Sequence, residues 1–600
     1  MFHVFHYLRG VAIGGVFEDK VLIFGLLQAL PLHSEVLYSE PEKLICTLFK
    51  LVEKSASRHC KTWQCPMDAT TSGSTSPIQY HNIVDQTLSL ITPFQQTCQS
   101  LQRHCFGTST PGEFPLAANP SLLLHMLTSC HLDPEDLANL EATCSFFRQP
   151  ANFAPDHELS ISELAALDMC RERAIIKPMS LEERELLKHR CGGSWKLVLK
   201  FLLAGEFCSQ RKKSQVVAGP GHSVAVTSRG AVYTFGANSL GQLGHGTLES
   251  EWKPRLVRSL QGIRIIQAEV GAGRTMLISD TGRVYAFGKD SFGEADYMTD
   301  WSKVVTTPKE VESLKDIFVV QAAIGNFFTA VLSREGRVYT FSWGSDARLG
   351  HHTQQNDVEP HQLKGPLENI PVVQISAGHC YLLALAYEPN GMSVYSVGCG
   401  LGGKLGHGSR MDEKYPRLIE QFQALNLQPK MISAGTWHAA VLGRDGRVCT
   451  WGWGRHGCLG HGDEDFVVTP KVVEALSMIK VVHIAAGDYT TFVVSEDGDI
   501  YSFGSSLSLN LGHDVEGDGQ VVNVQNVVLP KLVTTLKCGK ERVTRISVTN
   551  SIFWNSHTFV LTDAGNVYAF GAGDKGQLGI QLEEQQTERV IPERIDIDLS

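Results

Sequence analysis

RVCTWGWGRHGCLGHG, residues 447–462, is the stretch that decides the fold. Five of its sixteen residues are glycine, and it carries two tryptophans and two histidines. A phosphate-binding loop needs glycines that open onto a helix. Here the glycines follow a short β-type run, residues 447–451, and lead into another turn. A ligand loop would occur once in the chain, whereas a structural element would recur.

The pattern recurs seven times along the chain. Copies of a glycine, a short β-type run and a further glycine start at Gly230, Gly282, Gly336, Gly391, Gly446, Gly498 and Gly565. The intervals between these glycines are 52, 54, 55, 55, 52 and 67 residues. Regular spacing of this length indicates a repeat architecture.

Each repeat predicts about four short β-strands. Alternating apolar runs, such as residues 222–228, are typical of half-buried strands, and glycine turns separate them. A proline then opens another strand after each copy: Pro254, Pro308, Pro360, Pro416, Pro470, Pro530 and Pro592. Four-stranded units repeated seven times, without helices between them, predict a mainly β fold, a seven-bladed β-propeller over residues 212–600.

The two ends of the repeat region suggest how the ring closes. The first unit has no proline-led strand before it, and residues 592–600 form an outer strand with no unit after it. We therefore expect the C-terminal strand to complete the first blade, which would leave the ring without a free β edge.

The repeat units resemble those of the regulator-of-chromosome-condensation repeat family. The resemblance rests on VYTFG (232–236) followed by GQLGHG (241–246) and covers residues 212–600. It implies a seven-bladed propeller and, with the N-terminal segment described below, a plant-type member. The recurring glycines then serve turns and close strand approach, where a residue without Cβ is needed.

The same resemblance implies two alternative functions. The founding member of the family is a nucleotide exchange factor for a small GTPase and touches chromatin, but the one clear insertion here, residues 505–530, is not in the third or fourth unit. A plant ultraviolet-B receptor of the family reads light through recurring Gly-Trp-Arg-His-Thr motifs. Only Trp437 is tryptophan at the matching positions here.

Residues 118–207 predict a small helical domain. Asp133 to Asp136 form an acidic helix start with proline in the first turn. Leu-x-Pro-x-Asp-Leu followed by Cys-x-x-Phe-Arg resembles an F-box, which implies a contact stripe for a Skp-type adaptor. That stripe comprises Leu122, Leu123, Leu132, Leu137 and Phe147. The alternative is a helical cap that packs on the propeller.

The first 117 residues give weaker signals. Residues 67–117 are rich in Ser, Thr, Gln and Pro, which is typical of a disordered linker. Residues 1–66 show no period or caps, so we interpret them as an uncertain extension. A chain starting at Met67 should then fold as well as the full chain.

No catalytic, cofactor or metal motif is evident in the sequence. Nucleophile-elbow, Walker and zinc-protease patterns are missing, and we predict that the chain is not an enzyme. The formal net charge of −10 argues against nucleic acid as a partner. The fifteen cysteines form no Cys-x-x-Cys pair and suggest free thiols in the cytoplasm or nucleus, and we expect no membrane segment.

The remaining function is protein binding. Exposed aromatic residues on a propeller face are natural anchors for a partner, and the candidates are Trp301, Trp343, Trp437 and Trp453. The main hypothesis is a non-enzymatic interaction scaffold, which a genuine F-box would make the substrate receptor of a cullin-type ubiquitin ligase. The alternative is a guanine-nucleotide exchange factor for a small GTPase or a chromatin-associated regulator.

Overall fold

A computed structural model gives the structure of the chain. It describes residues 124, 127–128, 133–143, 145–148, 159–209, 214–289, 304–326, 328–342, 359–507, 509–513, 525–536, 541–550, 556–583 and 586–599. The chain forms two compact units, residues 1–169 and 170–600. Each unit is described by itself.

The first unit contains helix α6 (Pro134–Thr143), the short 3-10 helix η2 (Ser145–Arg148) and most of helix α7 (Ile161–Arg171). Helix α6 begins at the predicted acidic start, where the backbone N–H of Asp136 donates to Asp133 Oδ1 at 2.9 Å. The hydroxyls of Ser160 and Ser162 both donate to Glu141 Oε1, which ties the start of α7 to α6.

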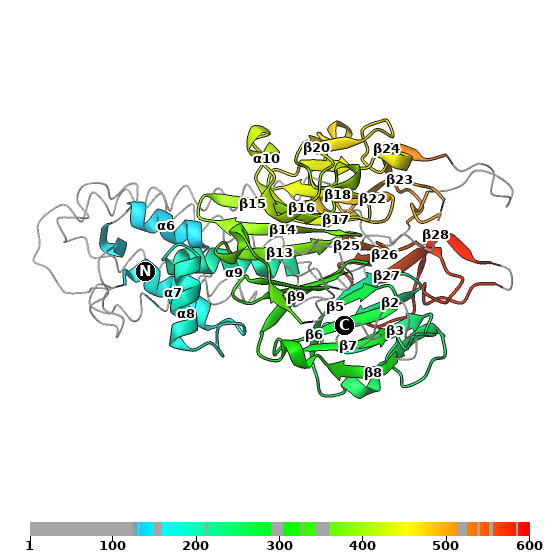
Figure 1. The fold of residues 1–600 in the computed structure, drawn as a ribbon, viewed down its shortest axis with the longest axis horizontal. Helices are drawn as coiled ribbons and strands as arrows, with labels where there is room; N and C mark the ends of the chain where they lie inside the picture. The colour runs from blue at the N-terminus through cyan, green and yellow to red at the C-terminus, as the bar shows by residue number, and fades with distance from the viewer. Residues whose placement is uncertain are drawn as a thin grey trace, which may run out of the picture. The chain divides into compact units, whose positions relative to one another are not determined.

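The second unit begins with two more helices, α8 (Leu181–Arg190) and α9 (Trp195–Ser209). A capping box begins α8, since Ser180 and Glu183 each accept from the other's backbone N–H. Helix α9 is apolar and lies beside strand β13, as Figure 1 shows.

Seven four-stranded antiparallel sheets follow, each built from consecutive strands. They confirm the mainly β fold and the seven-bladed propeller that the repeats predict. Blades 1 to 3 comprise β1 (Gln215–Ala218), β2 (His222–Val226), β3 (Val232–Gly236), β4 (Glu251–Leu256); β5 (Ile265–Gly271), β6 (Arg274–Ser279), β7 (Val284–Lys289), β8 (Val304–Glu310); and β9 (Val319–Ile324), β10 (Phe328–Ser333), β11 (Val338–Ser342), β12 (His361–Gln362). Blades 4 and 5 comprise β13 (Val372–Ala377), β14 (Tyr381–Glu388), β15 (Gly391–Gly398), β16 (Glu413–Leu418); and β17 (Pro429–Ala434), β18 (His438–Gly443), β19 (Val448–Gly452), β20 (Val467–Val472). Blades 6 and 7 comprise β21 (Val481–Ala486), β22 (Thr490–Ser495), β23 (Ile500–Gly504), β24 (Val527–Leu532); and β25 (Val543–Val548), β26 (His557–Thr562), β27 (Val567–Ala572), β28 (Glu588–Arg594).

Short helical turns lie in the connections between and within the blades. They are η3 (Arg258–Leu260), η4 (Glu312–Leu314), η5 (Pro366–Glu368), η6 (Leu401–Gly403), α10 (Gln421–Ala424), η7 (Arg455–Gly457) and η8 (Glu474–Leu476).

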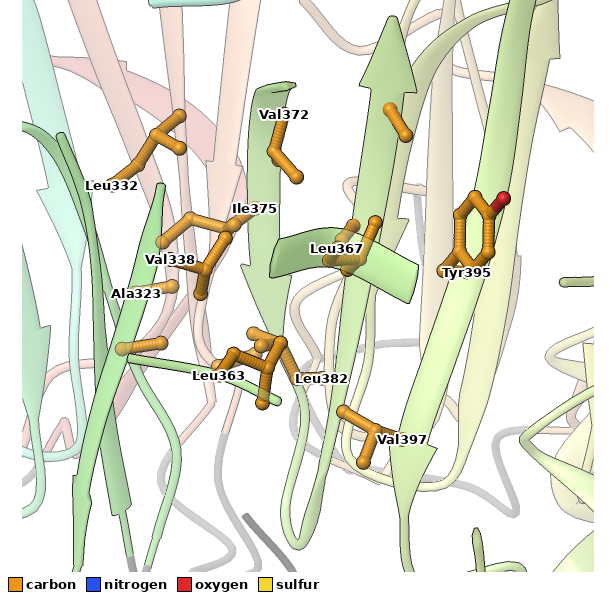
Figure 2. Packing of buried hydrophobic residues seen from close by; sticks show 14 of the residues in the cluster. Ala323, Leu332, Val338, Leu363, Leu367, Val372, Ile375, Leu382, Tyr395 and Val397 are labelled. Carbon is orange, nitrogen blue, oxygen red and sulfur yellow. The ribbon is translucent and has the colours of Figure 1, made fainter. Parts of the chain in front are cut away.

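The hydrophobic core lies between neighbouring blades. Figure 2 shows the interface of blades 3 and 4, where Val338 and Leu363 of one blade pack with Val372, Ile375 and Leu382 of the next. Comparable clusters join blades 1 and 2, 2 and 3, 5 and 6, 6 and 7, and 7 and 1. A blade has apolar side chains on both faces, so it is stable only when both neighbours cover it.

The predicted closure of the ring is wrong. Strand β28 pairs with β27 of its own blade, with Tyr568 opposite Arg594, and does not complete blade 1. Blade 1 already has its outer strand in β4, which contains Pro254. The proline-led strand ends each unit, so seven units supply seven outer strands and none is left over.

The tail after β28 joins the first and last blades instead. The carbonyl of Leu599 accepts from Ser228 N–H at 3.0 Å and from Ser214 Oγ at 2.7 Å. The Leu599 side chain is 1% exposed and belongs to the cluster that contains Val216 and Phe235 of blade 1. Leu599 and two hydrogen bonds, together with Ile595 and Ile597 in the same cluster, therefore anchor the C-terminal tail across the junction.

Buried histidines at one repeat position also join the blades. His222 Nε2 lies 2.9 Å from Thr275 Oγ1, His438 Nε2 2.7 Å from Thr491 Oγ1, and His557 Nε2 2.8 Å from Ser223 Oγ. Burial lowers the pKa of His222 to about 3 and that of His438 to about 4, so both rings stay neutral. As their recurrence indicates, these histidines serve packing and hydrogen bonding.

The two ends of the blades differ in what covers them. Within each blade, the turns from first to second and from third to fourth strand lie at one end, here called the AB/CD face. Helices α8 and α9 contact the opposite end: Arg190 donates to Glu368 O at 2.6 Å, and Glu183 pairs with Arg334 at 2.9 Å. The AB/CD face therefore lies away from these helical contacts.

Candidate functional site

Trp453 is one of two tryptophans at its repeat position, and the other, Trp343 of blade 3, lies outside the described residues. Trp453 lies on the AB/CD face, directly after β19 in blade 5. The same position in blades 1, 4, 6 and 7 holds small residues: Ala237, Cys399, Ser505 and Ala572. The loop therefore does not need a large side chain there, and the half-buried indole of Trp453 is available for another purpose.

Trp437 departs from the repeat in the neighbouring turn, between β17 and β18. The equivalent residues in blades 1 and 2 are Gly221 and Gly273, and in blade 4 Cys380. The sequence alone marks Trp437 as the one tryptophan at these positions. The structure adds that it lies beside Trp453.

Four rings form a continuous ladder across blades 4 and 5. The centroid of Trp437 lies 5.4 Å from that of His379 and 5.2 Å from that of Trp453, in an edge-on contact of 78° with the latter. Trp453 in turn stacks on Phe466 at 5.4 Å and 19°. Arg410 caps the ladder, with its guanidinium carbon 4.1 Å from the Phe466 centroid. Such contacts hold aromatic side chains in a fixed orientation.

Apolar side chains border the ladder on the blade 4 side. Leu401 is 56% exposed and Met411 72% exposed, and Phe466 on blade 5 is 40% exposed. Gly402 has a positive φ of 80°, and a Cβ there would lie 3.3 Å from that of Trp453. The close approach brings the two loops together. The name blade 4–5 patch is used below for Leu401, Arg410, Met411, Trp437, Trp453 and Phe466.

Lys404 lies beneath this patch and is fully buried. Its Nζ is 5.2 Å from the Trp437 centroid and 5.7 Å from that of Tyr381. The repeat places glutamine here in blades 1 and 7, where Gln242 and Gln577 close their own turn by accepting a backbone N–H at 2.9 and 2.8 Å. Lysine cannot accept, so Lys404 replaces a satisfied amide with a buried cation.

Two buried donors of the site lack an acceptor among the described residues. They are Lys404 Nζ and Trp437 Nε1. Both come from side chains that depart from the repeat. A buried donor without a partner costs free energy, and such a cost at two neighbouring atoms is characteristic of a binding site more than of a scaffold.

Asn550 supports the turn that carries Trp437. It follows β25 in blade 7, and its Nδ2 donates to Ala377 O and Ala434 O at 2.9 Å each. Its Oδ1 accepts from Thr436 Oγ1 at 2.7 Å. One amide thereby connects blade 7 with the ends of the inner strands of blades 4 and 5, and fixes the residue next to Trp437.

Blade 6 continues the site with polar groups. Tyr489 meets His456 edge-on, with 5.1 Å between centroids. Asp488, the preceding residue, is buried, and its Oδ1 has no partner among the residues that the structure describes. Burial raises the pKa of Asp488 to about 7, against the opposing effect of a hydrogen bond with Thr436.

The sequence-predicted residues have different outcomes. Trp437 and Trp453 are brought together. Trp301, Trp343, Leu122, Leu123 and Leu132 lie outside the described residues. Leu137 and Phe147 are described and are buried.

Sequence reasoning missed Lys404, Arg410, Phe466 and His379. A signal for Lys404 was available, because aligning the repeats with one another shows lysine where blades 1 and 7 carry glutamine. The stacking of Arg410 on Phe466 joins two blades and has no such signal. Trp451, two residues before Trp453, belongs to the core: it is fully buried, and its Nε1 donates to Lys404 O at 2.9 Å.

The chemistry of this site is that of recognition. It offers ring faces, apolar side chains and hydrogen-bond donors. Burial raises the pKa of the Cys458 thiol well above its ordinary value, which keeps it protonated. In the part of the chain that the structure describes, no cluster of three or more His, Cys, Asp or Glu side chains could hold a metal ion. Among the helices of those same residues, none has the length and apolar character needed to cross a membrane.

Comparisons with known proteins place these repeats among the propellers. The model of a family described as the RCC1-like domain matches residues 198–551. The ultraviolet-B receptor UVR8 of Arabidopsis thaliana is 28% identical over 393 residues, which cover 65% of this chain and 83% of UVR8. The human E3 ubiquitin-protein ligase HERC2 is 30% identical over 344 residues, which cover 57% of this chain but 7% of HERC2.

Solved structures agree with this fold. Yeast RCC1 (Prp20), solved with Kap60, superposes with a TM-score of 0.52 at 21% identity, covering 66% of this chain and 87% of that one. Human WBSCR16 gives a TM-score of 0.51 at 20% identity, covering 61% and 94%. At these identities the likeness shows the fold alone.

Proposed function

Because the chain belongs to the RCC1-like domain family, we propose that it is a non-enzymatic interaction scaffold that binds a protein partner through the blade 4–5 patch. The observation that carries this proposal is that three unusual side chains of the propeller lie close together. Trp437, Trp453 and Lys404 stand at three repeat positions where blade 1 has Gly221, Ala237 and Gln242. The Trp453 centroid and Lys404 Nζ each lie 5.2 Å from the Trp437 centroid.

The composition of the patch supports protein recognition. Tryptophan and arginine dominate the binding energy of protein interfaces, in particular where they are partly desolvated and surrounded by apolar neighbours. Trp437 and Trp453 are half-buried, and Arg410 is exposed and stacked on Phe466. Trp453 and Arg410 are already oriented by stacking on Phe466, which reduces the entropy lost on binding.

Proteins with this fold are described as binding other proteins. The structure of Prp20 with Kap60 is one, and a second study of Prp20 concerns its binding to Gsp1p and histones. These partners are those of Prp20. For this chain they support protein binding as the use of the propeller, while the partner's identity is left to experiment.

A role in ubiquitin ligation is the second candidate, as the substrate receptor of a cullin-type ligase. HERC2 and further relatives named as E3 ubiquitin-protein ligases match the propeller, and α6 begins where an F-box-like segment was predicted. In this proposal a Skp-type adaptor contacts Leu122, Leu123 and Leu132. Leu137 and Phe147, which are buried, then hold the helices in shape.

The test of the main proposal is partner recovery by the full chain and by Trp453→Ala. Alanine is already present at this position in blades 1 and 7, so the loop tolerates it. The matched control is Trp252→Ala, because Trp252 is 47% exposed on β4 of blade 1. We expect Trp453→Ala to lose the partner and Trp252→Ala to retain it. Equal recovery by both variants would contradict the proposal.

A nucleotide-release assay with purified small GTPases tests the exchange-factor alternative. The scaffold proposal expects release at the intrinsic rate. Accelerated release that depends on the chain would favour the alternative and displace the scaffold proposal.

A further inference from the structure

We propose that the partner segment on the blade 4–5 patch carries one carboxylate side chain next to an apolar side chain. The carboxylate binds Lys404 and Trp437, and the apolar side chain packs beside Trp453 and Phe466. This inference rests on the proposed function and names the chemistry of the partner, which that function leaves open.

The first argument is the buried cation. Lys404 has an ammonium group with three N–H donors, is 0% exposed, and its Nζ has no hydrogen-bond partner among the described residues. The two neighbouring rings attract the charge, but a cation–π contact replaces only part of the hydration that burial removes. The group that satisfies an ammonium is an anionic acceptor, and in a protein partner that is a carboxylate.

The second argument is that Lys404 is not the only residue of the patch with an unpaired hydrogen-bond donor. Trp437 Nε1 is also buried and unpaired within the described structure. The exposed guanidinium of Arg410 stacks on Phe466, and no carboxylate of the described residues lies within 4.0 Å of it. Three neighbouring side chains therefore present donors, and Lys404 Nζ and Trp437 Nε1 find no acceptor among the described residues, so the proposal assigns the acceptor to the partner.

The third argument limits the partner to a single carboxylate. Three acidic side chains that border the patch already accept hydrogen bonds, and Asp488, whose Oδ1 has no partner among the described residues, is buried. Asp412 Oδ1 accepts from Gly400 N–H at 2.8 Å, Asp463 Oδ1 from Asp465 N–H at 3.2 Å, and Glu464 Oε1 from Asn526 Nδ2 at 3.0 Å. These acids repel a run of negative charges, so a polyacidic segment or a nucleic acid backbone fits less well than one carboxylate.

The fourth argument concerns the apolar neighbour and access to Lys404. Leu401, Met411 and Phe466 expose apolar surface beside the ladder. The indole of Trp437 is held by ring contacts with His379 and Trp453, and its Nε1 makes no hydrogen bond to the described residues. Rotation of this indole therefore breaks no hydrogen bond, and it uncovers the ammonium for the incoming carboxylate.

The test is a peptide-display selection on the full chain. The probe is a random peptide library, and peptides that also bind the Trp453→Ala protein are removed by counter-selection. We expect the surviving sequences to share an Asp or Glu at a fixed distance from Leu, Met or Phe. Survivors that are basic or lack an acidic residue would overturn this inference but leave the proposed function standing. If no peptide depends on Trp453, the proposed function fails with it.

A titration of the best peptide then locates the carboxylate. Lys404→Gln should bind about 10- to 100-fold more weakly, the effect of losing a hydrogen bond to a charged group. Its melting temperature should equal or exceed that of the parent, because glutamine at this position closes the turn in blades 1 and 7. Arg258→Gln on blade 1 is the matched control and should bind as the parent does.

A double-mutant cycle completes the test. Replacing the peptide's acidic residue with its amide should weaken binding to the parent as much as Lys404→Gln does, and should cause no further loss in Lys404→Gln. Additive losses would place the carboxylate elsewhere and overturn the assignment. Binding of a single-stranded oligonucleotide at equal strength, with the same dependence on Trp453, would overturn it in favour of nucleic acid.

Discussion

Blades 1 and 2 and blades 4 and 5 have the same strands and the same turns, yet they present different surfaces. At the third position of the first turn, blades 1 and 2 carry Gly221 and Gly273, whereas blade 5 carries Trp437. After the third strand, blade 1 carries Ala237 where blade 5 carries Trp453. Because the fold accepts glycine and alanine at these positions, the tryptophans are not needed for folding. Residues that recur build the propeller, whereas Trp437 and Trp453 belong to the surface that we propose as its binding site.

The loop of blade 5 contains both kinds of residue within three positions. Trp451 is buried and takes the place of Phe235, Phe503 and Phe570 in other blades. Trp453 lies on the patch. We expect Trp451→Ala to lower the free energy of unfolding by about 3–5 kcal/mol, the usual loss for a buried aromatic residue. Trp453→Ala should change it by less than about 1 kcal/mol.

Thermal unfolding of both variants measures this contrast, with Trp451→Phe as the control. Phenylalanine serves at this position in other blades, so it should recover most of the stability, although the hydrogen bond to Lys404 O is lost. A larger loss in Trp453→Ala than in Trp451→Ala would reverse the distinction between core and patch.

A substitution at the ring closure tests whether blade 1 can be destabilised without affecting the blade 4–5 patch. Leu599 packs on blade 1, far along the ring from the blade 4–5 patch. Leu599→Ala should lower the free energy of unfolding by about 2–5 kcal/mol, since it removes a fully buried leucine side chain. Partner binding per folded molecule should be unchanged. Chemical denaturation and a binding titration at a temperature where both proteins are folded measure the two quantities. Unchanged stability would show that the tail does not fasten the ring.

The pH dependence of stability tests the buried acid beside the patch. Burial raises the pKa of Asp488 from 3.8 to about 7 in the folded chain, so the folded state binds this proton more tightly than the unfolded state does. The contribution of Asp488 to stability is therefore most favourable at low pH. It declines as pH rises from 3.8 towards 7 and stays unfavourable above that range.

Asp488→Asn keeps the side chain neutral at every pH. Above pH 7 it should be more stable than the parent by roughly 1–3 kcal/mol, the cost of a buried polar group without a full set of partners. The difference should shrink as pH falls towards 5. Asp497→Asn, at an exposed acid in the second turn of the same blade, is the control and should show no such trend. A constant difference between pH 5 and 8 would contradict the assignment.

The sequence predicts the propeller well because its signal is repeated seven times. A glycine, a β-type run and a proline-led strand recur in every unit, so an irregular copy in one blade is outweighed by the others. Closure was misread from the same pattern, because its starting point is ambiguous until β4 is seen to pair with β3. The recurrence of His222, His438 and His557 at one repeat position agrees with their structural role, since each makes an equivalent hydrogen bond to the next blade.

Only some residues of the blade 4–5 patch could be predicted, because its signal is not repeated in every blade. Trp437 and Trp453 stand out in the sequence as large aromatic residues in glycine-rich turns. Arg410 does not, because its contact with Phe466 joins the loops of two blades, and the sequence holds no record of which loops meet. The role of Asn550 is equally hidden, because it lies 116 residues from Ala434, one of its hydrogen-bond partners.

Substitution of Asn550 has the smallest expected effect on stability and tests the difference between blades 1–2 and blades 4–5. Its amide fixes the first turns of blades 4 and 5 and does not touch blades 1 and 2 in the described structure. Asn550→Ala removes three hydrogen bonds at a partly buried site, and we expect a loss of about 1–2 kcal/mol in the free energy of unfolding. Asn550→Asp should cost more, because a carboxylate cannot donate to the two carbonyls.

The effect of Asn550 on binding should act through Trp437, the neighbour of Thr436. Asn550→Ala should weaken binding at the patch severalfold in the parent, as expected for a residue that positions a contact without making it. In a Trp437→Ala background the same change should weaken binding no further, because the positioned side chain is gone. A loss of equal size in both backgrounds would mean that Asn550 touches the partner itself or supports the whole face. In that case blade 7 would also belong to the binding surface that distinguishes blades 4–5 from blades 1–2.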